Sequence, residues 1–203
     1  MTVKAFAGRH PVVAFYALVF AISWGGILLV VGPGGFLATT ATSASFALVG
    51  FVSILGPSLA GIILTRLVGG QAGWRDLLSR LRRWRVGWRW YAVALLTAPL
   101  VTMTTLAALS LTSPGFLPGI LTAEDKAFLL LSGIELGVIV PIFEELGWTG
   151  FVVPRLLPRH GVLGTGMIMG LLWGTWHLPL FAGSAAASGG IPQVLFMIAM
   201  LFA

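Results

Sequence analysis

Residues 12–31 read VVAFYALVFAISWGGILLVV, a run of 20 residues without a charged side chain. A helix of about 20 apolar residues is long enough to cross the hydrocarbon core of a bilayer. Similar runs recur along the chain, and each is bounded by glycine, proline or charged residues. We predict membrane spans at about 12–31, 46–68, 90–111, 128–157, 161–181 and from 191 to the last residue.

The composition also indicates a membrane protein. Hydrophobic residues make up 58% of the 203 positions and charged residues 9%, whereas soluble domains carry about a quarter charged residues. Continuous apolar runs favour helices, because the strands of membrane barrels alternate polar and apolar residues. The predicted fold class is therefore all-α, a polytopic transmembrane helix bundle of about six spans that forms a single membrane domain over residues 1–203.

The basic residues indicate an orientation in the membrane. With a cytoplasmic N-terminus, every lysine and arginine except Lys126 falls on the cytoplasmic side of the predicted spans, as the positive-inside bias requires. The loop Arg66–Arg89 is then cytoplasmic, and its mixture of arginine and tryptophan suits the headgroup layer of anionic lipid. We expect membrane lipids as partners and no nucleic acid, because no soluble domain carries these residues.

The adjacent acids Glu144 and Glu145 lie inside the predicted span 128–157. A charged side chain at bilayer depth costs about 2.5–3.5 kcal/mol or more, so such residues usually have a function or a buried partner. If the helix runs through the whole span the pair lies near its middle, and if it breaks at Pro141 the pair lies nearer the cytoplasmic end. Adjacent helical residues point about 100° apart, so the two acids should have different roles. One could act as a general base toward water, and the alternative is a neutralised buried pair.

His177 lies in the next predicted span, within the run LLWGTWHLPLF at 171–181. Trp173 precedes it by one helical turn, so the two rings should share one side of the helix. The histidine could orient a catalytic water, stabilise an oxyanion or bind a metal through a neutral nitrogen, and its type leaves these open. At 1.5 Å per residue it lies about 24 Å along the helix from residue 161, so tilt or an intramembrane helix start must bring it to the acids.

The runs EELGWTGF at 144–151, PRL at 154–156 and LLWGTWHLPLF at 171–181 resemble the CPBP family. This family comprises type II CAAX prenyl proteases and bacterial bacteriocin-processing or Abi-like immunity proteins, and its core would cover about 130–203 and continue beyond the chain end. By this resemblance, Glu144 would activate the water that attacks a peptide carbonyl. His177 would help to hold that water or the oxyanion, and Glu145 would support the site.

The resemblance also implies a substrate and a location. The substrate would be a membrane-associated peptide or protein, prenylated or bearing a leader peptide, in a bacterial plasma membrane, and Trp148 and Trp173 are predicted to bind it. The family is often called a metalloprotease family, so a divalent metal such as zinc is implied by name, with Glu144 and His177 as ligands if any. Metal dependence stays open, since these residues could hold zinc or activate water unaided.

This chain departs from the family pattern in specific places. Thr149 stands where the first motif has arginine, and Trp173 stands where the second has phenylalanine. The family's later histidine–asparagine motif has no match before Ala203, where the chain ends inside an apolar run, so we expect the parent sequence to continue. A non-catalytic immunity or scaffold relative that binds a membrane partner therefore stays open, as does a proton-coupled transporter.

Other protease classes lack the residues that they need. The chain has no cysteine, no His-Glu-x-x-His motif and no aspartate inside a predicted span. No histidine follows Ser184 or Ser188. The sequence therefore predicts an intramembrane endopeptidase in which Glu144 and His177 activate water.

Overall fold

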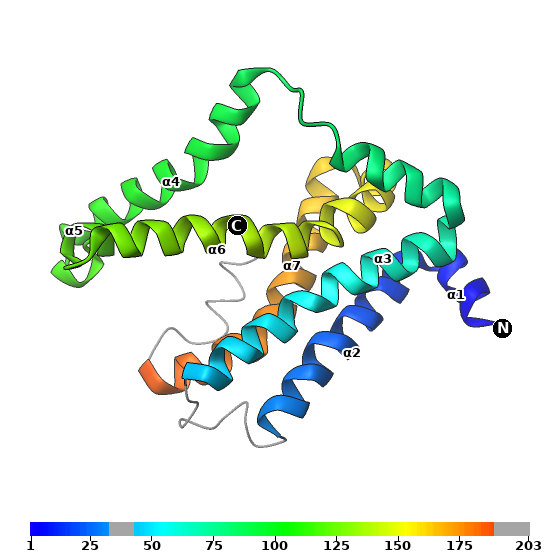
Figure 1. Ribbon diagram of the computed structural model, residues 1–203, viewed down its shortest axis with the longest axis horizontal. Coiled ribbons are helices and arrows are strands. Elements are labelled where there is room, and N and C mark those ends of the chain that lie inside the picture. Colours follow the sequence, from blue (N-terminus) through cyan, green and yellow to red (C-terminus); the bar gives the residue numbers. More distant parts are fainter. Residues whose placement is uncertain (33–42, 189–203) are drawn as a thin grey trace. The chain divides into compact units, whose positions relative to one another are not determined.

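The computed structural model describes residues 1–32 and 43–188, so the predicted span from 191 lies outside the described residues. In the described part all elements are helical and no strand is present. In chain order they are α1 (Val3–Arg9), α2 (Pro11–Val31), α3 (Ser43–Leu81), α4 (Trp88–Ser110), the short turn η1 (Pro114–Phe116), α5 (Gly119–Thr122), α6 (Lys126–Glu145), the π-helical turn η2 (Trp148–Val152) and α7 (Val153–Ser188) (Figure 1). The predicted all-α fold class is confirmed.

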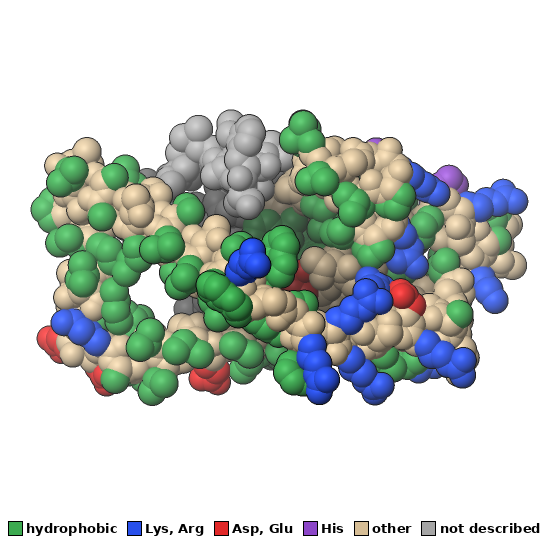
Figure 2. All heavy atoms as spheres, turned by 90° about the horizontal axis from the view of Figure 1, so that it is seen from above, with side chains coloured by type: hydrophobic (Ala, Val, Ile, Leu, Met, Phe, Trp, Pro, Cys, Tyr) green, Lys and Arg blue, Asp and Glu red, His purple; other side chains and the backbone are tan. Residues whose placement is uncertain are grey.

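Four stretches of the described chain are long and apolar enough to cross a membrane, namely Pro11–Val31, Ala47–Leu81, Trp88–Ser110 and Lys126–Pro179. The first and third coincide with the predicted spans 12–31 and 90–111, and the second begins with the predicted span 46–68 but continues to Leu81. The fourth covers the predicted span 128–157 and nearly all of 161–181. Hydrophobic side chains cover much of the face shown in Figure 2. The chain is an integral membrane protein.

The chain forms two compact units, one from Met1–Leu77 with Val140–Ala203 and the other from Leu78–Ile139. The first unit contains the acid pair and His177. The second contains α4, η1, α5 and most of α6. All residues of the predicted site therefore belong to the first unit.

An aromatic core joins α2 to η2 and α7 in the first unit. The ring of Phe15 on α2 packs against Trp148 and Phe151 at centroid distances of 5.2 and 5.6 Å. Trp148 in turn packs edge-on against Trp176 of α7 at 5.7 Å. All four side chains are almost completely buried, so this cluster fixes η2 and α7 against α2.

Two glycines change the direction of long helices. Gly70 in α3 and Gly161 in α7 have φ angles of +56° and +63°, which residues with a Cβ rarely adopt. After Gly70, α3 continues as helix to Leu81, so the predicted arginine-rich loop is non-helical only at residues 82–87. That part of the prediction is corrected: the segment after Gly70 is helical, and Leu77 on it is buried.

The predicted span 128–157 is not one continuous helix. α6 passes through Pro141 and ends at Glu145, and η2 then separates it from α7. Neither a helix through residue 157 nor a break at the proline is correct. The acid pair occupies the last two positions of α6.

Candidate active site

The position of the acid pair is unfavourable for helix stability. The C-terminal end of a helix carries a partial negative charge, so a carboxylate there costs about 0.3–1 kcal/mol instead of contributing. Glu144 and Glu145 both lie at this end of α6. Local helix energetics do not explain the pair, which favours a role in chemistry or binding.

Helix α3 holds the end of α6 in place. The backbone N–H of Gly147 bonds to the Glu144 carbonyl at 3.0 Å, a tighter pattern than in a regular helix. The hydroxyl of Ser58 on α3 donates to the carbonyl of Phe143. This side chain supplies a donor to one of the last carbonyls of the helix, which helix geometry leaves without partners.

Two glycines allow this close approach. A Cβ placed on Gly147 would lie 2.8 Å from the carbonyl carbon of Pro57 and 2.9 Å from the ring of Phe15. A Cβ on Gly61 of α3 would lie 2.8 Å from the carbonyl oxygen of Leu146. The φ of Gly147 is −89°, so lack of space and not backbone conformation requires glycine. The turn after the acid pair is therefore placed by backbone-to-backbone packing.

The two acids have different surroundings, as predicted from their positions on a helix. Glu144 is buried, with 9% of its surface exposed, whereas Glu145 is exposed. The indole N–H of Trp173 on α7 donates to Oε2 of Glu144 at 3.1 Å. A carboxylate that accepts such a bond keeps its other oxygen available for a proton, so Glu144 is the better candidate for a general base.

His177 lies beside the same tryptophan. Its Nδ1 lies 2.9 Å from the backbone carbonyl oxygen of Trp173, and the two rings meet edge-on at 4.1 Å. A carbonyl oxygen can only accept, so Nδ1 carries the hydrogen and Nε2 is the acceptor nitrogen of the neutral ring. This tautomer suits water orientation or metal binding through Nε2, whereas donation from Nε2 to an oxyanion would need the protonated ring.

Trp173 thus links the acid of one helix to the histidine of another. The sequence left open how His177, far along its helix, could approach Glu144. In the structure both side chains contact Trp173. Glu144 accepts from its indole N–H, and His177 contacts its backbone carbonyl oxygen.

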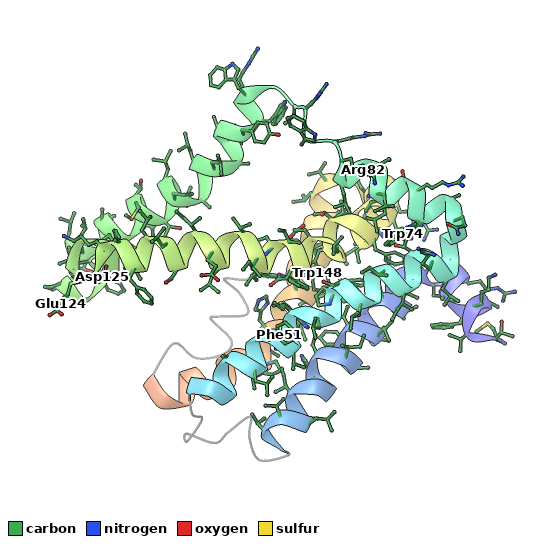
Figure 3. All side chains as sticks on the ribbon, in the orientation of Figure 1. Phe51, Trp74, Arg82, Glu124, Asp125 and Trp148 are labelled. Atoms are coloured by element: carbon green, nitrogen blue, oxygen red, sulfur yellow. The ribbon has the colours of Figure 1, made fainter. Side chains whose placement is uncertain are left out.

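Trp148, predicted to bind substrate, lies in the core (Figure 3). It is 2% exposed, and it contacts Phe15, Tyr16 and Trp176. Its indole N–H approaches the Glu144 carboxyl, but it makes no hydrogen bond of normal geometry within the described part of the chain. Because Trp148 is buried, it does not fit direct contact with a substrate. It instead fits a residue that packs beside Glu144 and supports its position.

Thr149 does not replace the arginine of the family motif. Its hydroxyl donates to the backbone carbonyl of Glu145 at 3.0 Å, and not to the carboxylate. Arg155 donates from Nη1 to the Phe151 carbonyl at 2.6 Å, and its guanidinium lies 3.6 Å from the centre of that ring. These two contacts of Arg155 are made with Phe151, so the supporting role of Glu145 rests on the resemblance alone.

The described residues do not by themselves form a complete metal site. Zinc in proteins is bound by three or four nitrogen, sulfur or oxygen ligands from side chains. Across residues 1–32 and 43–188, no three His, Cys, Asp or Glu side chains cluster in a way that could hold a metal ion. Glu144 and His177 would supply two ligands to a metal bound at this site.

The comparisons with known proteins concern the segment that contains this site. Residues 126–203 match the family model of the type II CAAX prenyl endopeptidases, described as Rce1-like. The predicted resemblance to the CPBP family is thus confirmed, through a segment that includes Glu144, Trp173 and His177.

One curated relative gives a local match. This chain is 35% identical over 43 residues to CAAX prenyl protease 2 of Methanococcus maripaludis. The alignment covers 21% of this chain and 16% of the length of that relative. The comparison with solved structures gives no match.

The sequence predicted the acids, the histidine and Trp173 but missed the residues that position them. Ser58, Gly61 and Gly147 lie at the crossing of α3 with the end of α6. Nothing in an apolar helix marks one serine or glycine among many as a contact point. For the contact with Glu144 the sequence did hold a signal, because the tryptophan at position 173 has an N–H that the phenylalanine of the family motif lacks.

Proposed function

We propose that this protein is an intramembrane endopeptidase that hydrolyses a peptide bond of a membrane-associated substrate. The observation that carries the proposal is the convergence of the Glu144 carboxyl and the His177 ring on Trp173, within a membrane helix bundle. The family match over residues 126–203 supports the same chemistry. By analogy with the similar CAAX prenyl protease 2, a prenylated C-terminal peptide is the first substrate to test.

The proposed reaction needs one base, one oriented water and a proton for the leaving group. Glu144 accepts a proton from water through the oxygen that Trp173 does not bind, and Nε2 of His177 accepts a hydrogen bond from the second water hydrogen. The water oxygen forms a bond to the carbonyl carbon, and the carbonyl electron pair moves to oxygen. When the C–N bond breaks, Glu144 returns its proton to the leaving nitrogen.

The orientation of the protein in the membrane is part of the proposal. The N-terminus and the Arg66–Arg89 segment face the cytoplasm, and the membrane is a bacterial plasma membrane, as the charge pattern and the resemblance favour. The exposed side chains of Trp84, Trp88 and Trp90 suit the headgroup layer of that face.

The direct test is peptide cleavage in nanodiscs by the protein and matched variants. We expect cleavage of a fluorogenic farnesylated peptide, and a loss of about 100-fold or more in Glu144→Gln and in His177→Ala. His160→Ala is the control, because this histidine is exposed and is not one of the residues proposed to act on the water. Equal rates in all four proteins would remove both residues from the mechanism.

A non-catalytic relative is the second candidate. Thr149, whose hydroxyl serves a backbone carbonyl and leaves Glu145 without the motif arginine, is the observation that favours it. Such a protein would bind the farnesylated peptide without cleaving it, and Glu144→Gln would leave that binding unchanged. Cleavage that is restored or increased by Thr149→Arg would instead support the endopeptidase.

A further inference from the structure

Trp173 makes three separate contacts with the two residues of the proposed reaction. Its indole Nε1 donates to Oε2 of Glu144 at 3.1 Å, and its carbonyl accepts from Nδ1 of His177 at 2.9 Å. Its ring also meets the imidazole edge-on at 4.1 Å. A single residue therefore sets the rotamer of the acid and both the tautomer and the tilt of the histidine.

The side-chain contact depends on the indole nitrogen. An indole has one N–H, which can only donate, so its partner oxygen is committed as an acceptor. Hydrogen bonds to charged acceptors are the strongest of the side-chain bonds, and they favour the ionised carboxylate. Phenylalanine, which the family motif has at this place, keeps the ring contact with histidine and loses the bond to Glu144.

The helix around Trp173 is anchored on both sides of it. Trp24 of α2 donates its indole N–H to the carbonyl of Trp176 at 3.1 Å. Trp176 is 1% exposed and packs against Trp148. Tyr16 of α2 reaches the sulfur of Met169 one turn earlier, at 3.3 Å. The turn that carries Trp173 is thus fixed to α2, as a residue that aligns two others requires.

We propose that Trp173 is a positioning residue of the hydrolytic site, and that it does not bind the substrate as its sequence position suggested. This inference rests on the proposed function. Its indole N–H orients Glu144 so that Oε1 faces the water, and its carbonyl keeps the His177 Nε2 as the acceptor.

The first experiment separates positioning from substrate binding by steady-state kinetics. In Trp173→Phe, kcat on the farnesylated peptide falls about tenfold or more while KM changes less than twofold. Trp74→Phe is the matched control, since the ring of Trp74 contacts Arg66 on the same helix α3 and the change is chemically identical. A rise in KM with kcat unchanged would overturn the proposal in favour of substrate binding.

The second experiment does not need protease activity, so it separates failure of this inference from failure of the proposed function. Dicyclohexylcarbodiimide modifies protonated carboxylic acids in membranes, and mass spectrometry measures the label on Glu144. Removal of the N–H donor favours the protonated form, so Trp173→Phe should label several times faster than wild type or Trp74→Phe. Equal labelling rates in the three proteins would show that the indole does not hold this carboxyl.

An isosteric replacement covers the case in which Trp173→Phe fails to fold. Benzothienylalanine at position 173 replaces the indole N–H with sulfur and keeps the size of the ring system. The protein with this analogue should unfold at the same temperature as wild type. It should nevertheless show the same fall in kcat and the same faster labelling of Glu144 as Trp173→Phe. Wild-type kinetics and labelling with this analogue would overturn the proposal.

Discussion

The crossing of Gly147 and Pro57 gives a quantitative prediction about Gly147→Ala. The added Cβ would lie 2.8 Å from the carbonyl carbon of Pro57, whereas ordinary van der Waals contact begins at 3.4 Å. The difference, 3.4 minus 2.8, gives a separation of about 0.6 Å for the carbonyl carbon, and the carbonyl oxygen of Pro57, which lies closer, requires more. The nearest atoms are backbone and an aromatic ring, so no flexible side chain can absorb the shift.

Both stability and activity should respond to this separation. Overpacking a well-packed site costs about 1–3 kcal/mol, which lowers the thermal unfolding midpoint by several degrees. A displacement of about 1 Å can reduce catalysis about 100-fold, so we expect a loss of about 10- to 100-fold. Glu144 is only three residues from Gly147, and its bond to Trp173 stretches with the shift.

The assay compares cleavage rate and unfolding midpoint in nanodiscs for wild type, Gly147→Ala and Gly133→Ala. Gly133 also lies on α6, and a Cβ there meets nothing within 4 Å among the described residues. That control should retain activity and gain slightly in stability, because alanine favours helix. If Gly147→Ala matched wild type in both rate and midpoint, the reasoning about the crossing would be refuted.

Two further predictions concern the bond from Ser58 to the end of α6 and the orientation of the chain in the membrane. Ser58→Ala removes the donor to the Phe143 carbonyl and should lower the unfolding free energy by about 1 kcal/mol, measured by thermal unfolding. Ser110→Ala is the control, because the Ser110 hydroxyl donates to the Ala107 carbonyl of its own helix. The chain has no cysteine, so Val86→Cys and Thr122→Cys can each be probed with a membrane-impermeant maleimide in right-side-out and inverted vesicles. Val86→Cys should label from the cytoplasmic face and Thr122→Cys from the opposite face, and the reverse result would contradict the charge-based orientation.

The sequence alone determined membrane residence, the helical class and the positions of the first three described spans. These follow from free energies that are local along the chain, because an uncharged run of about 20 residues has one favourable environment whatever its neighbours are. The candidates Glu144 and His177 also came from the sequence, since charge and imidazole are rare in apolar helices and stand out without any knowledge of contacts.

Only the tertiary structure decided where α6 ends and what holds its acids. The prediction of a helix through residue 157 failed because the break comes from α3, which approaches through Gly61 and packs against Gly147. The burial of Trp148 in the core and the bond from Trp173 to Glu144 likewise join residues that are distant in the sequence. Hydrophobic periodicity shows which residues leave water, but not which neighbour each will meet, and at this site the neighbours determine the chemistry.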